Sequence, residues 1–410
     1  MYPRMLASVL RQHLKGHYGL LLLGPRQVGK TTLIRESLAP SDSWTLDLSD
    51  FAEFQRFLKD HDLFNRQAQA RLGEASPDKP VRVFIDEVQR LPRLLDGCQW
   101  LYDRHPDRFR FVLTGSSARK LRRAGANLLP GRIVVKHLHP LVWEEMGIGS
   151  PDPVVSPFAD TRRPGSSPAP ECSEFLLRGT MPGILAAPDE SRDDLLQSYA
   201  LTYLKEEIQA EALVRSLDGF SRFLELAAVE SGNATNYQNL AQEAGVRLNT
   251  VKNYYSILVD TLVAIPLEPY LRNARKRLIA APRLYFFDTG VRNAAAGLPL
   301  DPSMLKVEGG RLFEHFVILE LFRRFSYLRP EWRLYYWRTA AGAEVDLVVD
   351  TKKGLVPVEI KYAASTRNLH LRGLSAFMDD YGCSKGYVVG NFKAAEKLDR
   401  RVTALPWWAL

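Results

Sequence analysis

The stretch LLLLGPRQVGKTTLI, from Leu20 to Ile34, joins an apolar run to a glycine-containing turn, a lysine and two threonines. It matches the pattern G-x-x-x-x-G-K-[ST], with a strand pattern before it and a helix pattern after it. The main-chain N–H groups of such a turn surround phosphate oxygens, and the following helix presents its positive end to them. We therefore expect Lys30 to reach the outer phosphates of a nucleotide and the Thr31 hydroxyl to bind Mg²⁺. The predicted phosphate-binding residues are Gly24, Pro25, Arg26, Gln27, Val28, Gly29, Lys30, Thr31 and Thr32.

A second stretch, VRVFIDEVQRLP, supplies the acids that a working phosphate site needs. Its apolar strand, 81–85, is followed by Asp86, which we expect to bind Mg²⁺ through water, and by Glu87, which we expect to polarise the attacking water. This pair predicts hydrolysis rather than binding alone. A third strand, in RFRFVLTGSSARKL, ends in polar residues from Thr114 to Ser117. These groups either sense the terminal phosphate or cap a helix, and both interpretations stay open.

Taken in this order, the phosphate loop, the Asp-Glu pair and the TGSS strand end resemble the AAA+ ATPases, in particular prokaryotic ones with a separate C-terminal domain. The resemblance extends over nearly the whole chain, through stretches such as LLPGRIVVKHLHPLVWEE, LLRGTMPGIL and YYWRTAAGAEVDLVV. It implies ATP and Mg²⁺ as cofactors. It also implies self-association, because such enzymes take a finger arginine from a neighbouring subunit. Arg132, in LPGR, is the candidate finger or sensor arginine, and Arg119 and Arg122 are its alternatives.

Composition narrows the class of protein. A chain of 410 residues with 46% hydrophobic and 25% charged content is typical of a multidomain globular protein. Lys and Arg outnumber Asp and Glu by 55 to 47, and the net charge of +8 favours polyanionic partners. The three cysteines and the pair His137 and His139 lie at no zinc-ligand spacing, so we expect no zinc site. The sequence shows no signal peptide and no apolar run of membrane-spanning length, so we expect a cytoplasmic protein without membrane contact.

The proline-rich stretch 149–170 marks the clearest boundary and predicts an exposed linker or insert. Before it, helical segments alternate with five short apolar runs, which is typical of a parallel α/β sheet; the runs are 19–23, 44–48, 81–85, 109–113 and 133–136. After it comes a helical region that includes 193–230. It is followed by a helix at 310–325 and five strand-like runs, at 284–287, 333–337, 345–349, 356–360 and 386–389. We predict a AAA+ domain at 1–148, a linker at 149–171, a helical and winged-helix domain at 172–282 and a second α/β domain at 283–410.

The middle of the chain predicts a helix-turn-helix at 236–265, with a turn at Gly245 and a second helix opened by Asn249 or Thr250. The following stretch LRNARKRLIAAPR, 271–283, has the composition of a wing that follows phosphates. Such a domain can instead serve packing or a protein partner, and this alternative stays open. The second helix offers Arg247, Asn249, Lys252 and Asn253 to DNA. The predicted nucleic-acid contacts are Lys252, Arg272, Arg275, Lys276 and Arg277, with Arg283 in the same wing.

The last domain carries charged residues in an ordered pattern, with Glu314 on a helix, Glu344 and Asp346 in a hairpin, and Glu359-x-Lys361 on a strand. Residues two apart on a strand share a face, so Glu359 and Lys361 should point the same way. The pattern resembles the PD-(D/E)XK nuclease fold. That resemblance implies that Glu314, Asp346 and Glu359 hold one or two Mg²⁺ ions and that Lys361 orients or deprotonates the nucleophile. A fold of this kind can also lose cleavage and keep its acids.

These patterns predict an α/β protein with a P-loop AAA+ parallel-sheet domain, a helical and winged-helix region and a C-terminal α/β restriction-endonuclease-like domain. The predicted catalytic residues of ATP hydrolysis are Lys30, Asp86, Glu87 and Arg132, and the predicted metal ligands are Thr31, Asp86, Glu314, Asp346 and Glu359. We expect the protein to act on DNA, with metal-dependent cleavage by the last domain as one hypothesis. The alternative is an ATP-dependent switch or scaffold that recruits a protein partner and carries an inactive nuclease-like domain.

Overall fold

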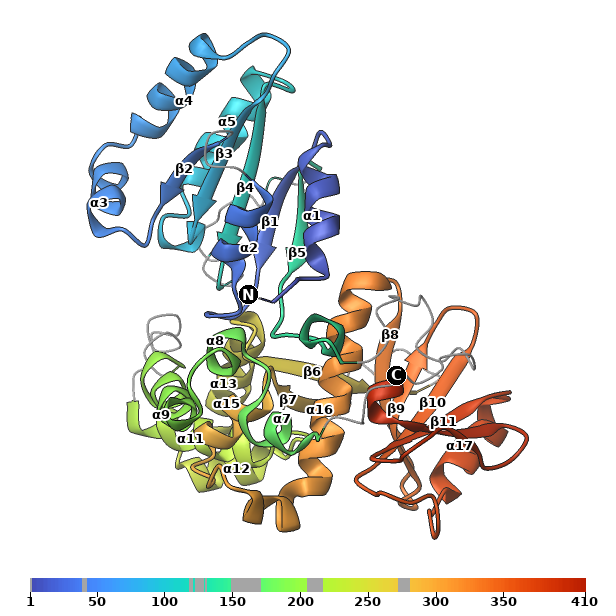
Figure 1. Ribbon diagram of the computed structural model, residues 1–410. Helices are drawn as coiled ribbons and strands as arrows, with labels where there is room; N and C mark the ends of the chain where they lie inside the picture. The colour runs from blue at the N-terminus through green and yellow to red at the C-terminus, as the bar shows by residue number, and fades with distance from the viewer. Residues whose placement is uncertain are drawn as a thin grey trace. The chain divides into compact units, whose positions relative to one another are not determined.

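The computed structural model describes residues 2–38, 43–117, 121, 129, 131–148, 171–204, 217–271 and 281–410, apart from the side chains of Tyr203 and Leu217. These residues form two compact units (Figure 1). The N-terminal unit comprises 3–139 and 260–263, and the C-terminal unit comprises 140–259 and 264–410. Each unit has its own sheet and its own apolar core.

The N-terminal unit contains a five-stranded parallel sheet, which confirms the five predicted strands. The strands are β1 (Gly19–Leu23), β2 (Trp44–Asp47), β3 (Val81–Asp86), β4 (Phe109–Gly115) and β5 (Ile133–His137), in the order β2-β3-β4-β1-β5. β1 and β4 are buried along their whole length, as expected for central parallel strands covered on both faces. Because all neighbouring pairs are parallel, the carboxyl ends of the strands meet at one edge of the sheet.

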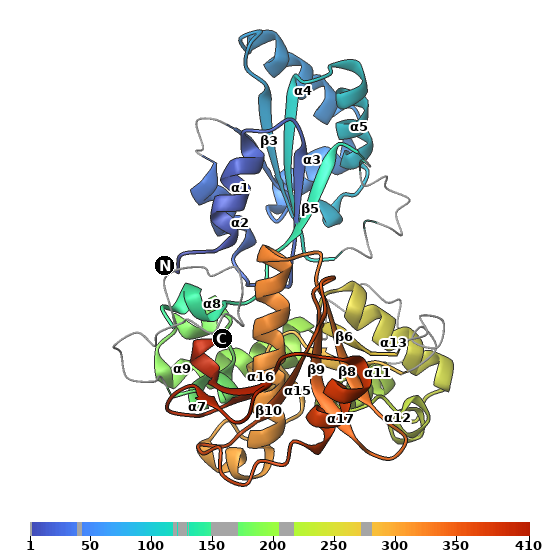
Figure 2. The same cartoon turned by 90° about the vertical axis from the view of Figure 1, so that its right-hand side faces the viewer.

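Helices lie on both faces of this sheet (Figure 2). They are α1 (Leu6–Leu14), α2 (Lys30–Ser37), α3 (Phe51–Lys59), α4 (Leu63–Glu74) and α5 (Leu94–Arg104), with a short 3₁₀ helix η2 (Val88–Arg90). Buried side chains such as Phe57, Phe64 and Leu101 pack with the strands in one apolar core. Asp50 begins α3 as a regular N-cap, because its carboxylate accepts hydrogen bonds from the backbone N–H groups of the first turn.

The C-terminal unit contains a mixed eight-stranded sheet in the order β12-β13-β11-β10-β9-β8-β6-β7. Its strands are β6 (Ala264–Pro269), β7 (Arg283–Phe286), β8 (Arg333–Arg338), β9 (Glu344–Asp350), β10 (Leu355–Lys361), β11 (Gly386–Gly390), β12 (Glu396–Lys397) and β13 (Val402–Pro406). Five of them were predicted as strand-like runs. The other three, β6, β12 and β13, were not.

Helices lie around this sheet, and those between residues 173 and 260 confirm the helical character of the middle of the chain. They are α7 (Ser173–Arg178), α8 (Pro182–Leu185), α9 (Asp189–Ser198), α11 (Leu217–Val229), α12 (Tyr237–Ala244), α13 (Leu248–Asp260), α15 (Thr289–Ala295), α16 (Leu305–Leu328) and α17 (Arg372–Tyr381), with short helices η3 (Trp143–Met146), η5 (Pro302–Met304) and η6 (Trp407–Ala409). The predicted helical stretch 193–230 is not one regular α-helix, because a π-helical turn, η4 (Tyr199–Tyr203), follows α9. Residues 205–216 of that stretch lie outside the described residues.

The units divide the chain differently from the predicted domains. β6 and β7 form one antiparallel pair, with Ala264 opposite Phe286, so the predicted boundary after residue 282 falls inside a hairpin. β6 also pairs in parallel with β8, which places strands of both predicted domains in one sheet. The segment 140–148 belongs to the C-terminal unit, because Leu141 N–H donates to the Thr180 carbonyl and Trp143 packs in that unit's core. The predicted linker, 149–170, lies outside the described residues.

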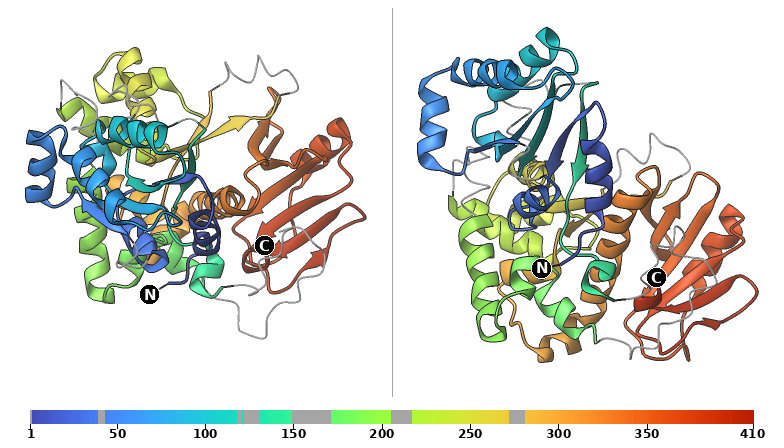
Figure 3. Two further views of the ribbon diagram at one scale, coloured as in Figure 1. Left: turned by 90° about the horizontal axis from the view of Figure 1, so that it is seen from above. Right: turned by 45° about the horizontal axis from the view of Figure 1, so that its top comes forward.

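The 24-residue helix α16 runs beside the sheet of the C-terminal unit (Figure 3). Its apolar residues pack with Trp143 and Trp407 in the core. It also buries a set of charges, Glu320, Arg323 and Arg324. The chain satisfies these charges with partners from distant segments, since Arg323 reaches Thr180 at 2.7 Å and Glu320 accepts from the Trp143 N–H at 3.2 Å. Burying charge is costly without such partners.

Candidate nucleotide site and C-terminal acidic centre

The predicted phosphate loop lies between β1 and α2, at the carboxyl edge of the N-terminal sheet. Two glycines in it are required by geometry. A Cβ on Gly24 would lie 2.3 Å from the carbonyl oxygen of Leu138, and Gly29 has φ of +92°, in the left-handed region. The Lys30 side chain is buried, and its Nζ donates to the carbonyls of Gly24 and Pro25, both at 2.9 Å. The loop therefore holds the lysine cation against its own main chain.

Arg4 is a residue of this site that the sequence analysis missed. Its Nη1 donates to the Val28 carbonyl at 2.7 Å, and its Nη2 donates to the His139 carbonyl at 2.6 Å. The guanidinium therefore ties the phosphate loop to the segment that follows β5. No motif marks this residue, because the partners are backbone carbonyls and lie 24 and 135 positions away.

Asp86, at the end of β3, is joined to the phosphate loop. Thr31 Oγ1 donates to Asp86 Oδ2 at 2.7 Å, and the Thr114 hydroxyl, from the neighbouring β4, donates to the other carboxylate oxygen. Burial raises the pKa of the Asp86 carboxyl, which these hydrogen bonds oppose. Hydroxyl and carboxylate oxygens are the donors that Mg²⁺ prefers. The positions of Thr31 and Asp86 therefore fit the predicted magnesium site.

Glu87 follows Asp86 with φ of +56°, an uncommon conformation for a residue with a side chain. Its N–H donates to Thr114 Oγ1 at 3.0 Å, and its carboxylate accepts from Gln89 Nε2. The same Gln89 nitrogen donates to Ser116 Oγ at 3.0 Å. Gln89 was not predicted, although it stands in the quoted motif. It connects the predicted catalytic glutamate to the polar end of β4.

Arg132 lies at the opposite edge of the sheet. It precedes β5, and its carbonyl accepts from the N–H of Gly19, the first residue of β1. The length of β1 separates it from the phosphate loop by roughly 15 Å. Its guanidinium pairs with Asp103. The structure therefore does not place Arg132 as a sensor at its own nucleotide site, and its action on a neighbouring subunit stays a prediction. Arg119 and Arg122 lie outside the described residues.

The predicted helix-turn-helix corresponds to α12, a left-handed turn at Gly245 and α13. α13 begins at Leu248, so Asn249 and Thr250 lie in its first turn and do not cap it, which corrects that detail. The polar residues predicted to contact DNA are all exposed, namely Arg247, Asn249, Lys252 and Asn253. Positions three and four apart share a helix face, so α13 presents three of these side chains together.

The predicted wing gives a mixed result. β6 and β7 pair as antiparallel strands after α13. Arg272, Arg275, Lys276 and Arg277 lie outside the described residues. Arg283 is not a surface residue of a wing, which corrects its predicted place. It is 5% exposed, because its guanidinium pairs with Glu314 and Glu344 and lies 4.5 Å from the centre of the Tyr336 ring.

The C-terminal acidic centre consists of Glu314, Glu344, Asp346 and Glu359 with the cations Arg283 and Lys361. Lys361 Nζ lies 2.6 Å from Glu359 Oε1 and 3.8 Å from Asp346 Oδ2. Asp346 Oδ2 also accepts from the Ile360 N–H at 2.7 Å. The structure therefore brings Asp346, Glu359 and Lys361 together, as the sequence predicted.

Glu314 lies in the same centre but faces other partners. Its Oε1 accepts from the Tyr285 hydroxyl at 2.9 Å and lies 3.2 Å from Arg283 Nη1. Burial, and then the charge of Asp346, raise the pKa of Glu314. Burial, and then Asp346 again, raise the pKa of Glu359 to about 7. Glu314 and Glu359 therefore keep their protons to a higher pH than exposed carboxyl groups do.

The predicted metal site in this centre stays a prediction, because the structure gives it no support. A hard cation needs several converging oxygen ligands, and among the described residues no group of three His, Cys, Asp or Glu side chains is placed to hold one. The two cations of this centre, Arg283 and Lys361, already form ion pairs with its carboxylates. Arg283 is paired with Glu314, and Lys361 is paired with Glu359. Glu359 Oε2 is buried without a hydrogen-bond partner in the described part of the chain.

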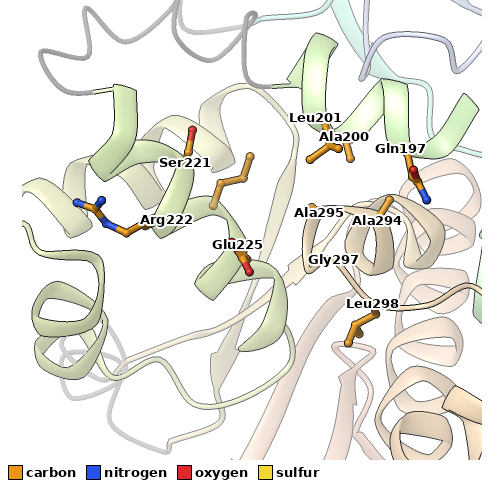
Figure 4. A pocket seen from close by; sticks show the side chains of 11 residues that line it. Gln197, Ala200, Leu201, Ser221, Arg222, Glu225, Ala294, Ala295, Gly297 and Leu298 are labelled. Atoms are coloured by element: carbon orange, nitrogen blue, oxygen red, sulfur yellow. The ribbon is translucent and has the colours of Figure 1, made fainter. Parts of the chain in front are cut away.

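A cavity of about 390 Å³ lies in the C-terminal unit between α9, α11 and α15 (Figure 4). Its polar lining residues include Gln197, Ser221, Arg222 and Glu225. Figure 4 shows Arg222 directed away from the cavity, and its Nε donates to the Ala244 carbonyl at 3.2 Å. A binding site needs polar groups that converge on a ligand. This cavity does not offer that arrangement.

Comparison with known proteins supports the first of these sites. Residues 17–147 match a family described as AAA domain, residues 170–301 match a domain of unknown function (DUF8612), and residues 309–410 match another (DUF4143). Two curated relatives are uncharacterized proteins, Rv2008c of Mycobacterium tuberculosis and Mb2031c of Mycobacterium bovis. Each is 28% identical over 379 residues, which cover 91% of this chain and 76% of the relative.

Matches among solved structures are distant. One is a signal transduction ATPase with numerous domains from Pyrococcus horikoshii, 13% identical with a TM-score of 0.28, covering 80% of this chain and 47% of that one. Another is PCH-2 of C. elegans, 19% identical with a TM-score of 0.22, covering 61% of this chain and 66% of that one. These TM-scores are too low to support an argument. The chain spans less than half of the first of these proteins.

No helix in the described ranges is long and apolar enough to cross a membrane. For the N-terminal unit, the family match agrees with the phosphate loop and with the carboxylate that Thr31 and Thr114 hold beside it. Residues 17–147 are therefore similar to AAA domains in sequence and carry a phosphate loop of the P-loop type.

Proposed function

We propose that this chain binds and hydrolyses ATP and uses the reaction to act on DNA. The observation that carries the first half is the hydrogen bond between Thr31 and Asp86, 2.7 Å long, which joins the phosphate loop to the acidic strand end. This is the spacing at which one cation could contact both residues. The half-buried Glu87 beside them is held in place by two hydrogen bonds.

The roles of the residues follow from their positions. Lys30 exchanges its bonds to the Gly24 and Pro25 carbonyls for contacts with the outer phosphates, which keeps the cation in the loop in both states. Thr31, and Asp86 through water, would hold Mg²⁺, which would neutralise charge on the phosphates. Glu87 orients and polarises the attacking water, and Gln89 keeps the Glu87 carboxylate in one position.

An ATPase assay with matched variants tests this proposal. Lys30→Ala should lose ATP binding, whereas Glu87→Gln should bind ATP with nearly unchanged Kd and hydrolyse it at least about a hundredfold more slowly. Lys59→Gln, which removes a surface charge at the end of α3, is the control and should behave as the wild type. If Lys30→Ala and Glu87→Gln both hydrolyse ATP at the wild-type rate, the proposal fails.

We further propose that Arg132 acts on the nucleotide of a neighbouring subunit in an ATP-dependent assembly. Its place at the sheet edge opposite its own phosphate loop supports a role between subunits. The test mixes Glu87→Gln, which keeps the arginine, with Arg132→Ala, which keeps an intact site. Recovery of activity above that of either variant alone supports the proposal. An Arg132→Ala variant with full activity, or light scattering that shows monomers with ATP for Glu87→Gln, contradicts it.

Action on DNA is supported by the polar face of α13. Asn249, Lys252 and Asn253 are exposed on the second helix of a helix-turn-helix arrangement, which is the position that enters the major groove in DNA-binding proteins of this type. The ATPase rate should rise with single-stranded, duplex or branched DNA, and Lys252→Ala should weaken that response. A rate that no DNA changes, together with no measurable DNA binding, would leave the switch or scaffold alternative.

For the C-terminal acidic centre the observations favour a domain that does not cleave. Arg283 neutralises Glu314 and Glu344 inside the centre, as a metal ion would in a nuclease. The protein should therefore leave linear, nicked and branched DNA intact with Mg²⁺ or Mn²⁺. Cleavage that disappears in Lys361→Ala would contradict this interpretation and restore the nuclease hypothesis.

A further inference from the structure

Two adjoining hollows lie at the amino-terminal edge of the N-terminal sheet. One, of about 400 Å³, is lined by 14–17 before β1 and by Asp107, Arg108 and Arg110 around the start of β4. The other, of about 740 Å³, is lined by 43–45 at the start of β2 and by the end of α4. They share Pro80 and Arg82 and so form one groove, which we name the amino-edge groove. Because the strands are parallel, the groove and the phosphate loop lie at opposite edges of the sheet.

The amino-edge groove is rich in cations. Six lysine and arginine side chains line it, namely Lys15, Arg71, Lys79, Arg82, Arg108 and Arg110. The acids in its lining are Glu74, Asp78 and Asp107. The lining is therefore positive overall. A concave surface of one sign concentrates oppositely charged ligands.

Part of this positive charge is not satisfied within the described chain. Arg82 Nε and Arg108 Nε are buried without a hydrogen-bond partner among the described residues. Asp107 is already shared by His17, at 3.2 Å, and Arg110, at 3.4 Å. Arg110 is a structural residue, since it is buried and its Nε donates to the Gly16 carbonyl at 3.0 Å. Lys15 is exposed and Arg82 is partly exposed, and neither forms an ion pair with another described residue, so an anion in the groove would reach these two side chains.

The aromatic residue in the groove helps to define the ligand. The Trp44 ring stacks on Phe64 with centroids 5.5 Å apart, and the Arg71 guanidinium lies 4.3 Å from the centre of the Trp44 ring. These neighbours occupy the ring, so it is not free to stack on an unpaired base, as proteins that bind single strands require. The groove therefore offers charge without stacking. Recognition of this kind follows the phosphates of a duplex.

We propose that the amino-edge groove binds the phosphate backbone of duplex DNA, independently of base sequence. The inference rests on the proposed action on DNA and adds a second contact surface to that of α13. It assigns the groove to the ATPase domain itself, at the sheet edge away from the nucleotide. ATP and DNA can then be bound by this domain at the same time.

Fluorescence anisotropy of a labelled duplex tests the proposal, with the full chain titrated at salt concentrations from about 50 to about 200 mM. The plot of log K against log salt has a negative slope, and each lost phosphate contact reduces the magnitude of this slope by about one. Lys15→Gln/Arg82→Gln should thus reduce the slope by about two and weaken binding about tenfold or more at about 0.1 M salt. Lys59→Gln/Lys353→Gln removes the same charge from exposed positions outside the groove and should change neither. ATP binding should be unaffected in all variants.

The possible results separate this proposal from the broader one. If the wild type binds no duplex at any salt concentration, both the action on DNA and the groove proposal fail. If the wild type binds and Lys15→Gln/Arg82→Gln matches the control variant in slope and affinity, the groove proposal fails while action on DNA stands. If the groove variant loses more affinity for a single strand than for a duplex of equal length, the assignment to duplex backbone is wrong.

Discussion

Replacing Gln89 by leucine should slow ATP hydrolysis without weakening ATP binding. The Gln89 side chain is 4% exposed, and its Nε2 donates both to the Glu87 carboxylate and to Ser116 Oγ. Leucine has a similar volume and no donor, so Gln89→Leu should keep the packing and remove both hydrogen bonds. A hydrogen bond to a charged group contributes about 1.5–3 kcal/mol. If that contribution is fully expressed in the transition state, kcat should fall by about ten- to 150-fold.

The expected pattern is specific because the two hydrogen bonds of Gln89 Nε2 go to Glu87 and Ser116, which lie outside the phosphate loop. The steady-state ATPase assay should therefore show a lower kcat with KM for ATP within about twofold of the wild type. Ser116→Ala is the matched variant, since it removes one of the two partners and leaves the bond to Glu87, and it should cost less. A Gln89→Leu enzyme with unchanged kcat, or with raised KM and full kcat, would refute the positioning role.

Three further perturbations test the loop and the core. Gly24→Ala should abolish binding of a fluorescent ATP analogue, because the new Cβ would lie 2.3 Å from a carbonyl oxygen. Gly73→Ala is the control: a Cβ there has no neighbouring atom within 4 Å, so this variant should bind the analogue normally and melt at a higher Tm. Arg323→Met should lower the urea-derived free energy of unfolding by about 3–5 kcal/mol, because the buried Asp288 loses its cation; a loss under about 1 kcal/mol would count against this pairing. Burial, and then nearby charges, lower the pKa of His315 from 6.5 to about 3. Between these values the unfolded chain binds a proton that the folded chain does not, so stability should fall by about 1.4 kcal/mol per pH unit below about pH 6, and a urea titration of His315→Gln should show a shallower fall.

The N-terminal fold could be predicted because its signals are local. Central strands such as β1 and β4 are buried on both faces, so they appear in the sequence as unbroken apolar runs. The phosphate loop needs small residues at fixed spacing, and its glycines are visible in the sequence. By contrast, Arg4 and Gln89 each act through two hydrogen bonds to groups that no spacing rule connects to them. Their roles became visible only in the structure.

The C-terminal unit was less predictable because its sheet is assembled from distant segments. β6 lies in the predicted winged-helix domain, yet it pairs both with β7 and with β8. The sequence gives no signal that two strands pair when they lie in different predicted domains. The proximity of Asp346, Glu359 and Lys361 could be predicted, because they lie on two neighbouring strands, β9 and β10, that pair as a hairpin. The side to which Glu314 turns depends on Tyr285 and was not predictable.

Two arginines show why a count of charges does not locate a binding surface. Arg283 was assigned to a phosphate-binding wing, and Arg82 was not singled out. Burying an arginine costs several kcal/mol unless acids meet it, and Glu314 and Glu344 arrive from 31 and 61 positions further along the chain to do so. Arg82 is partly exposed and forms no ion pair with another described residue. The net charge of +8 therefore does not show which cations reach an external anion, because distant acids decide this for each arginine separately.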